Sequence, residues 1–388
     1  MQQDPRFTLI SLVPELHAGT GHVLGYHTSV GEAARIAGWR HVALVPHDHG
    51  AQPLPQDWRP VLRPGALAAG LMEAIRTLQL RRLFGDAALF AGSVREGVAA
   101  VMDGSGGRGA LFVERFNGAQ LLGVVRASRL LRSERLDFWL MFRQDLQSTG
   151  LVGRLAYRWA VAQLARDWGD RFRLLADSES LAAELERDLG LKAHVMPIPH
   201  THESVAAPFA KEPGEIVCWW PGAPRGEKGL ASIQALAAAQ PPAGIAPMRV
   251  VVSEETQLPQ AHGVRVERVP ARLDELEYDR WLATADVVLL PYAPDRYRHS
   301  TSGIFVEAVV GGCVPVVSRG TWMAHELVRH DLAELAIDWG DAARVLKCID
   351  AFARDAGVRA KLDAMRKHFA GYHCERSYAA ALRALQRA

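Results

Sequence analysis

The sequence has few cysteines, little net charge and no long apolar run. Its 388 residues include four cysteines, and Lys plus Arg exceed Asp plus Glu by only 45 − 43 = 2. The cysteines are far apart and form no C-x-x-C pair, which argues against a disulfide scaffold or a zinc site and is typical of a reducing compartment. The net charge near zero gives no indication of the basic surface that binds nucleic acid. No stretch approaches the roughly 18 apolar residues of a membrane span, so we expect a cytoplasmic protein.

The chain is long enough for two domains. It exceeds the roughly 250 to 300 residues at which single cores stop growing. Short apolar runs alternate with longer helical patterns in both halves, which is typical of parallel β-α-β units. The first series ends at the proline-bearing segment AHVMPIPHTHE, and a second series begins at EIVCWWPG. We therefore predict an α/β protein with two Rossmann-like domains, residues 1–198 and 199–370, facing across a ligand-binding cleft.

Residues 300–320 place one carboxylate, Glu307, among hydroxyls and apolar residues. DVVLLPY predicts a strand, APDRYRHSTSG a loop, and IFVEAVVGG a helix. The unpaired N–H groups of a helix N-terminus attract phosphate, and Gly303 allows close approach. Glu307 lies about one turn into this helix, where it is suited to accept hydrogen bonds from a ribose or sugar hydroxyl. An ordinary capped helix with an acid favoured by the helix dipole explains the same residues.

A second segment, CWWPGAPRGEKGL at 218–230, carries Arg225 and Lys228. A strand runs here into a turn rich in glycine and proline before a helix, so two cations are able to converge on one anion. A solvated turn has the same composition. Because both segments lie at strand-to-helix junctions of one domain, together they predict an anion-binding site.

Four segments in this order, PGAPRGEKGL, VRVERVP, ADVVLLPY and SGIFVEAVVGGCVPVVS, resemble the C-terminal nucleotide-sugar domain of family 4 type glycosyltransferases with the GT-B fold. RLLADSESLAAELERDLGLKAHVMPIPH is similar to the end of that family's N-terminal domain, and HAGTGHVLGYHTSVGEAARIAGWRHVALVP to its glycine loop, first helix and second strand. The resemblance implies a nucleotide-sugar-dependent, hexosyltransferase-like enzyme. It also implies that residues 371–388 form a helix returning to the first domain.

The resemblance implies Lys228 on the donor diphosphate, Glu307 on the ribose, and a turn at Arg268 bordering the base. The candidate catalytic residues are Arg225 and Lys228, which would stabilise the leaving diphosphate. His22, before the first helix, is a third candidate that could polarise a hydroxyl, and a helix cap or a residue lining the cleft explains it equally. The implied donor-binding residues are Gly19, Gly21, Gly222, Arg268, Val269, His299, Ser300, Thr301, Ser302, Gly303, Ile304 and Glu307.

Three positions depart from the family pattern. His299 occupies the place of the first Glu of the family's Glu pair, and Ala223 the place of the Arg that directly follows the loop glycine. At the end of the strand ALFVERF the family often has His, where this chain has Glu114 and Arg115. The identity of the donor therefore stays open.

The expected activity is transfer of a sugar from a UDP- or GDP-type donor to a glycan, lipid-linked or small-molecule acceptor, in polysaccharide biosynthesis. By family analogy the anomeric configuration is retained. We expect no metal and no cofactor besides the nucleotide sugar, because the sequence has no Asp-x-Asp pair and the HDH segment at 47–49 offers no third ligand. Two alternatives are a nucleotide-sugar epimerase of the same architecture and a non-catalytic protein that binds a nucleotide or a glycan.

One helical stretch, ALAAGLMEAIRTLQLRRLF at 66–84, raises the question of a membrane. Arg76, Arg81 and Arg82 stand beside leucines in it, which suits a helix lying on anionic lipid. An amphipathic helix packed on its own sheet has the same pattern. Peripheral membrane contact is the alternative that we keep, and a spanning segment is not expected.

Overall fold

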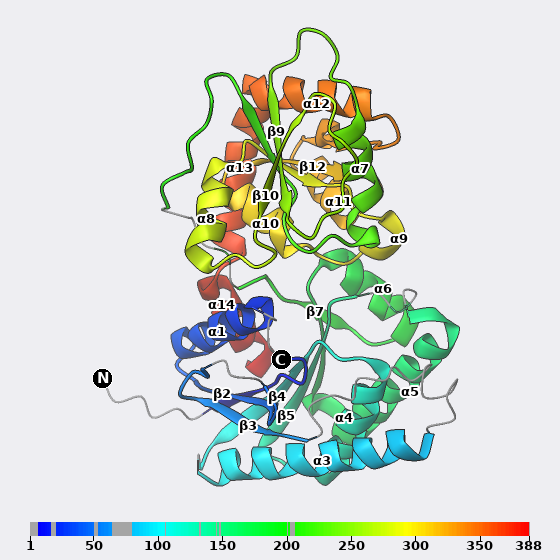
Figure 1. Cartoon of the computed structure of the whole chain (residues 1–388). Helices are drawn as coiled ribbons and strands as arrows, with labels where there is room; N and C mark the ends of the chain where they lie inside the picture. The colour runs from blue at the N-terminus through cyan, green and yellow to red at the C-terminus, as the bar shows by residue number, and fades with distance from the viewer. Residues whose placement is uncertain are drawn as a thin grey trace. The chain divides into compact units, whose positions relative to one another are not determined.

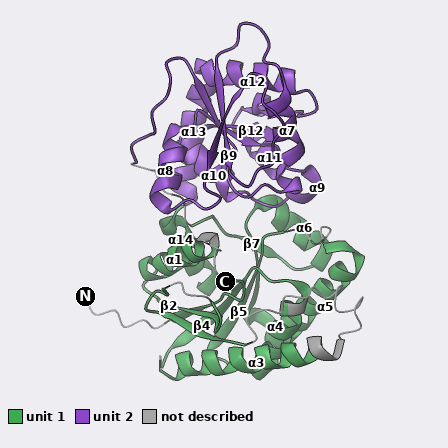
Figure 2. Ribbon diagram, in the orientation of Figure 1, with its two compact units in different colours: residues 1–200, 374–388 green, residues 201–373 purple. Residues whose placement is uncertain are grey.

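The computed structural model of the chain describes residues 7–16, 21–49, 53–63, 80–104, 106–131, 133–144, 146, 149–199, 201 and 206–387, with the side chains of 21, 22, 80–83 and 119 left aside (Figure 1). The chain forms two compact units (Figure 2). Unit 1 comprises Met1–His200 and Cys374–Ala388, and unit 2 comprises Thr201–His373. The boundaries expected from the sequence, at 198/199 and 370/371, lie close to these divisions.

In the described part of unit 1, a parallel sheet has the strand order β3-β2-β1-β4-β5-β6-β7. Its strands are β1 Phe7–Leu12, β2 Arg40–Pro46, β3 Trp58–Leu62, β4 Arg108–Glu114, β5 Leu136–Phe142, β6 Phe172–Ala176 and β7 Ala193–Val195. Its helices are α1 Gly21–Ile36, α3 Leu80–Asp103, α4 Gly118–Leu130, α5 Gly150–Trp168, α6 Glu179–Leu189 and α14 Glu375–Arg387.

Both faces of the central strands of this sheet are buried, which explains why these strands are continuous apolar runs. Along β1, Phe7 and Leu9 pack with α1 and α14, whereas Ile10 and Leu12 pack with α3, α4, α5 and α6. This alternation is the two-residue period of a strand. The C-terminal helix α14 belongs to unit 1 because it packs beside α1 (Figure 1).

In unit 2, the described residues form a second parallel sheet, of order β10-β9-β8-β11-β12-β13. Its strands are β8 Ile216–Trp219, β9 Met248–Ser253, β10 Arg265–Val269, β11 Val287–Leu290, β12 Val314–Ser318 and β13 Ala336–Ile337. Its helices are the 3₁₀ turn η3 Gly226–Lys228, α7 Leu230–Ala238, α8 Glu275–Thr284, α9 Pro294–Tyr297, α10 Gly303–Val310, α11 Trp322–Arg329, α12 Ala342–Arg354 and α13 Ala356–Tyr372.

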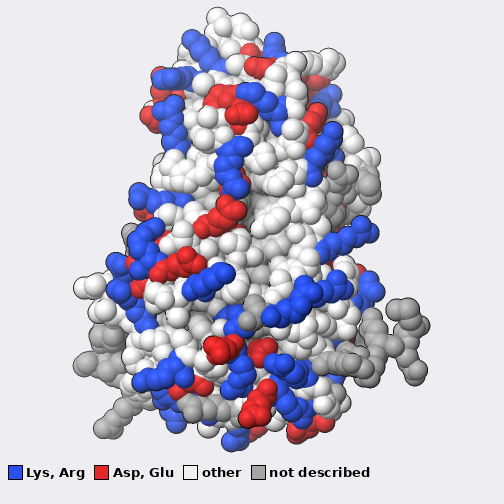
Figure 3. Space-filling view, turned by 180° about the vertical axis from the view of Figure 1, so that it is seen from behind, with Lys and Arg blue, Asp and Glu red and all other residues white. Residues whose placement is uncertain are grey.

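The predicted α/β class with two Rossmann-like sheets is confirmed, although β3, β13 and α11 were not predicted. The segment APDRYRHSTSG, predicted as a loop, contains the short helix α9, because Pro294 at its start has a φ suited to a helix. The edge strand β3 contains Pro60, which has no N–H for a ladder bond and is therefore tolerated at a sheet edge. Most of the stretch considered for lipid contact, residues 66–79 of 66–84, lies outside the described residues; the helix α3 is described from Leu80. Charges of both signs are interspersed on the face shown in Figure 3.

Candidate functional site

Two neighbouring loops in unit 2 leave the sheet at the same edge. The strand β8 ends at Trp219 and β11 ends at Leu290, and the two strands pair in parallel, so the segments that follow them are adjacent. The first segment carries η3, and the second leads through α9 to the N-terminus of α10. Carboxyl ends of adjacent parallel strands are where open α/β sheets bind ligands. The two segments singled out in the sequence therefore meet.

Glycines allow the first loop to pack closely against the second. Gly229 has φ +83°, and a Cβ there would stand 2.1 Å from the carbonyl oxygen of Pro291. Gly222 has φ +89°, and a Cβ there would lie 3.1 Å from the Lys228 ammonium and 3.9 Å from Ile304 Cδ1. The structure thus brings together three of the predicted site residues, Gly222, Lys228 and Ile304. Only glycine adopts such φ values readily.

The positive charge of Lys228 is only partly balanced by nearby acids. Its ammonium lies 5.7 Å from the ring centroid of Tyr292. Burial and the nearby Arg225 lower the pKa of Lys228 to about 8, while Glu227 and Glu307 act in the opposite direction. Since desolvation is the leading cause, an anion placed beside the ammonium would raise the pKa again. The site is therefore suited to bind an anion such as a phosphate.

Arg225 is more exposed than Lys228. Its side chain is 59% accessible, and its guanidinium lies 3.6 Å from the carboxylate of Glu227. The backbone around it is fixed, because the N–H of Ala293 donates to the carbonyl of Glu227 and the indole of Trp220 donates to the carbonyl of Lys228. Arg225 therefore stands at the solvent side of the loop.

The carboxylate of Glu307 is oriented by a tyrosine from another helix. The hydroxyl of Tyr278 in α8 donates to Glu307 Oε2 at 2.5 Å. Trp219 packs edge-on against Tyr278, with ring centroids 5.0 Å apart. Burial and the charge of Glu307 raise the pKa of Tyr278 well above its ordinary value, which keeps the hydroxyl protonated as a donor. The sequence analysis missed Tyr278, because local patterning does not show which distant residue pairs with a carboxylate.

The N-terminus of α10 completes this edge. Ser302 caps the helix, and its hydroxyl accepts from the N–H of Phe305 at 3.3 Å. Gly303 and Ile304 are in the first turn, where N–H groups have no partner within the helix. Ser300 and Ser302 are buried, whereas His299 and Thr301 are half-buried. The expected cluster 299–304 thus lies beside the loop that holds Lys228.

Arg268 and Val269 lie at the same edge of the sheet but two strands away. The Arg268 guanidinium donates to the carbonyl oxygens of Thr256 at 2.6 Å and Glu254 at 3.3 Å, so it braces the loop after β9. Of the predicted residues in unit 1, Gly19 lies outside the described residues and Gly21 is the first residue of α1. The side chain of His22 is likewise outside the description.

Unit 1 contains a buried charge network that the sequence analysis did not assemble. Glu114 ends β4, and Arg143 and Asp177 follow β5 and β6 directly. Arg143 donates to Glu114 at 2.8 Å and to Asp177 at 3.3 Å, and His27 Nε2 lies 3.1 Å from Glu114. Burial disfavours the charge of Glu114, but Arg143 and His27 hold its pKa at about 2. One pattern in the sequence could have predicted this network, because polar residues that directly follow adjacent parallel strands meet at one edge of the sheet.

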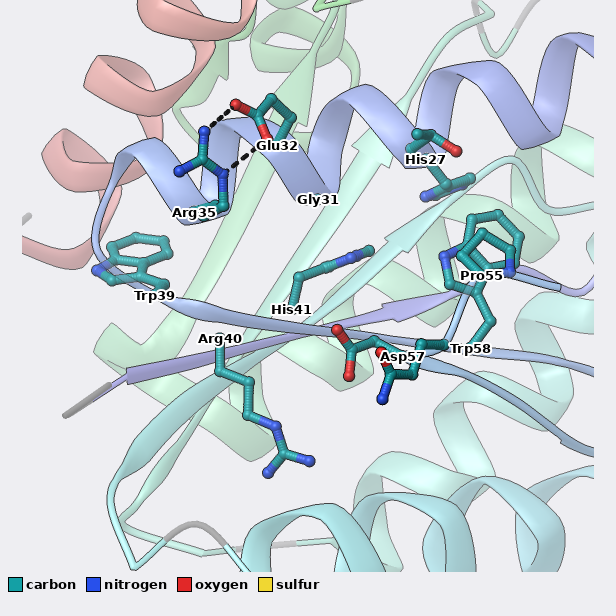
Figure 4. A pocket seen from close by; sticks show the side chains of 12 residues that line it. His27, Gly31, Glu32, Arg35, Trp39, Arg40, His41, Pro55, Asp57 and Trp58 are labelled. Atoms are coloured by element: carbon teal, nitrogen blue, oxygen red, sulfur yellow. Dashed lines mark hydrogen bonds and ion pairs between the residues drawn. The ribbon is translucent and has the colours of Figure 1, made fainter. Parts of the chain in front are cut away.

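A separate pocket of about 370 Å³ lies in unit 1 between α1 and the strands β2 and β3 (Figure 4). His41 forms part of it and shares a hydrogen bond of 2.9 Å with the hydroxyl of Ser11. Burial lowers the pKa of His41 to about 3, so this imidazole is neutral at physiological pH. Arg35 pairs with Glu32 at the pocket, as the dashed lines in Figure 4 show. Acids and bases balance in this lining, which gives it no preference for ligands of one charge.

Among the described residues, no three His, Cys, Asp or Glu side chains converge as they would around a metal ion, and His47 and His49 are included in that statement. Nor does any described helix combine the length and the apolar character needed to cross a bilayer.

Comparison with solved structures defines the fold. HepE from Anabaena, in complex with UDP-glucose, matches with a TM-score of 0.62 and 14% identity over 98% of this chain and 100% of that chain. Trehalose-6-phosphate synthase OtsA matches with a TM-score of 0.63 and 12% identity over 99% of each chain. The glycosyltransferase SnogD from Streptomyces nogalater matches with a TM-score of 0.52 and 17% identity over 98% of this chain and 99% of that chain. The chain therefore has the GT-B fold of these glycosyltransferases. No family model and no curated protein matches it.

Proposed function

We propose that the protein is a glycosyltransferase that uses a nucleotide sugar, with the donor bound at the loops of unit 2. The observation that carries the proposal is the Lys228 ammonium, which is desolvated and stands beside Gly222 and the first turn of α10. Lys228 and the N–H groups of that turn bind the donor diphosphate, and Glu307 accepts from the ribose hydroxyls. HepE, which shares the fold, was solved in complex with UDP-glucose.

The chemistry follows from where charge develops. As the bond between the anomeric carbon and the diphosphate oxygen breaks, negative charge grows on the leaving nucleoside diphosphate. Lys228, Arg225 and the helix amides meet that charge, and the acceptor oxygen forms the new bond to the anomeric carbon. The acceptor proton leaves with the diphosphate or through a side chain of unit 1, for which His22 is our candidate.

The proposal extends to the family, the donor, the stereochemistry and the acceptor. We assign the chain to the family 4 type because of the loop and helix segments around Lys228 and Glu307, and we propose a UDP- or GDP-hexose as the donor. Retention is supported by likeness to trehalose-6-phosphate synthase, whose glycosyl transfer proceeds with retention. We propose that no metal is needed, because side chains and amides supply the positive charge, and that the acceptor is a glycan, a lipid-linked sugar or a small molecule. The setting that we propose is polysaccharide biosynthesis in the cytoplasm.

An epimerase of the same fold would need an acid and a base that exchange protons at neutral pH. In unit 1 we considered Glu114 for this role. Its side chain is buried, and its pKa of about 2 keeps it ionised. The network around it is therefore suited to hold Arg143 in place rather than to shuttle protons. Transfer is the function that the geometry supports better.

A thermal-shift screen with UDP, GDP, ADP and their sugar conjugates tests the donor site. A ligand that binds only the folded state at about 100 times its Kd adds about 2.7 kcal/mol, which is a rise of a few degrees for a chain of this size. We expect a base-selective shift that is lost in Lys228→Ala and in Glu307→Ala. It should persist in Lys361→Ala, which removes an exposed lysine of the same unit. A shift retained in both site variants, or no shift with any nucleotide, would overturn the proposal.

A further inference from the structure

The helix α5 exposes an apolar face that the core does not explain. Its inward side contributes Tyr157, Ala160, Val161, Leu164 and Trp168 to the core of unit 1. Its outward side exposes Leu151 by 75%, Leu155 by 57%, Trp159 by 46% and Val152 by 40%. We call Leu151, Val152, Leu155, Trp159, Arg158 and Arg166 the α5 surface. Contiguous exposed apolar side chains of this kind mark interaction sites.

Helical spacing makes this surface continuous. Leu151, Leu155 and Trp159 follow one another at intervals of four residues, so they lie in one row along the helix. These side chains and Val152 are four of the ten large apolar side chains that are exposed in the described part of the chain. An amphipathic helix of a globular protein normally turns one apolar stripe to the core, whereas α5 has a second stripe facing solvent.

The charge on this surface is positive. Arg158 and Arg166 are exposed and form no ion pair with any described residue. The acid on α5, Asp167, pairs with Arg129 of α4, and Arg154 pairs with Asp188 of α6.

The flanking helices differ in charge. The helix α4 adds the exposed Arg126 and Leu130 on one side of α5. The helix α6, on the other side, exposes the acids Glu179 and Glu186 together with Arg187. The apolar row is thus bordered by cations toward α4 and by charges of both signs toward α6.

We propose that the α5 surface binds the interface of an anionic lipid membrane. Leucine and valine side chains enter the boundary of the acyl chains, a tryptophan sits at the level of the head groups, and arginines pair with lipid phosphates. A second copy of the chain fits less well, since a two-fold axis at the middle of α5 brings Arg158 toward Arg158 of the other copy. A zwitterionic membrane offers lipid phosphates but no negative surface potential, so it would attract both arginines less strongly.

The position of α5 connects this surface to the proposed function. The helix follows β5, so Leu151 and Val152 stand near the carboxyl edge of the sheet of unit 1. Tyr157 confirms this placement, since its hydroxyl donates to the carbonyl of Phe116 just after β4, at 3.2 Å. If the proposed transfer holds, a membrane bound at the α5 surface brings a lipid-linked acceptor to the edge of the sheet where Arg143 lies. This consequence rests on the proposed function, whereas membrane binding by itself does not.

Flotation with vesicles tests the proposal on the full chain. We expect binding to phosphatidylcholine vesicles that contain phosphatidylglycerol, and little binding to pure phosphatidylcholine. Arg158→Glu/Arg166→Glu should weaken binding by about fivefold or more for each arginine, and high salt should act in the same direction. Leu155→Ser/Trp159→Ser should weaken it by about tenfold or more. Leu276→Ser/Val328→Ser, which changes exposed apolar residues of unit 2, and Arg344→Glu should leave it unchanged.

Two further readouts keep the outcomes separate. The thermal midpoint of each variant reports folding, and the nucleotide-induced shift reports the donor site without reference to lipid. Absence of flotation by the unchanged protein, or equal flotation of all variants, overturns the proposal. So does a concentration-dependent dimer in analytical ultracentrifugation that is lost in Leu155→Ser/Trp159→Ser, because the surface then binds a second copy. Nucleotide binding without lipid binding leaves the proposed function intact and refutes only this inference.

Discussion

The lowered pKa of Lys228 predicts how donor binding depends on pH. In the free protein the ammonium titrates at about 8, because it is desolvated and close to Arg225. A bound diphosphate stabilises the charged form, so the pKa rises in the complex and the ligand binds the protonated lysine preferentially. Affinity should therefore be nearly constant below pH 7 and should fall as the pH rises through 8.

The magnitude follows from the two protonation equilibria. The apparent Kd scales with one plus ten to the power of the pH minus the pKa, as long as the lysine stays protonated in the complex. Between pH 7 and pH 9 the Kd for a nucleotide sugar should rise about tenfold, or about 1.4 kcal/mol. The same lowered pKa destabilises the folded state relative to a free lysine below pH 8, and this penalty disappears between pH 8 and the ordinary pKa of lysine.

Isothermal titration calorimetry at several pH values measures this profile. Lys228→Arg keeps the charge throughout this range, and should therefore remove the tenfold change even if its affinity differs. Titration of the ligand itself would appear in both proteins. An equal slope for Lys228→Arg and the unchanged protein would refute the assignment of Lys228 to the diphosphate.

Three further predictions concern single side chains. Tyr278→Phe removes the donor to the Glu307 carboxylate, and should cost about 1.5 to 3 kcal/mol of stability in urea unfolding and weaken binding of the nucleotide. Gly229→Ala forces a side chain onto a neighbouring carbonyl at positive φ, and should lower the free energy of unfolding by more than about 1 kcal/mol, whereas Gly226→Ala, with open space around it, should not. Arg143→Ala removes the cation that two buried carboxylates share, and should cost about 3 to 5 kcal/mol.

The network of Arg143 also makes a prediction for acid. Because the pKa of Glu114 is lowered to about 2, its contribution is fully present above its unfolded pKa and is lost as the pH falls from about 4 to 2. This part of the acid unfolding profile should disappear in Glu114→Gln. An acid unfolding profile of Glu114→Gln equal to that of the unchanged protein would contradict this role of Glu114. Wild-type stability of Arg143→Ala, Tyr278→Phe or Gly229→Ala would contradict the contacts of that side chain.

Much of the site in unit 2 was predictable because its parts are contiguous segments. The glycine-rich turn with Lys228 and the helix with Glu307 each follow an apolar strand, and β8 and β11 are neighbours in the sheet. Hydrophobic patterning thus predicted both the strands and the edge at which the two loops meet. The resemblance to a known family then suggested the ligand that we propose for them.

What the sequence analysis missed depends on pairing between distant side chains. Tyr278 contacts Glu307 across 29 positions, and Arg143 contacts Glu114 across the same separation. Neither pair follows from local periodicity, because a buried polar residue has many possible partners before the sheet order is known. The second apolar stripe of α5 was hidden for a related reason: its leucines and tryptophan look like core residues until the burial of each is known.

The most direct test of the central claim is product analysis of the nucleotide sugar that the thermal-shift screen selects. The protein is incubated with this donor and candidate acceptors, and the nucleotide and sugar products are separated by chromatography. The proposed transfer predicts release of the nucleoside diphosphate and a glycosylated acceptor, with a rate about 10² to 10³ lower in Lys228→Ala and unchanged in Lys361→Ala. An unchanged donor would contradict catalysis, and an intact donor with an inverted sugar centre would show epimerisation instead of transfer.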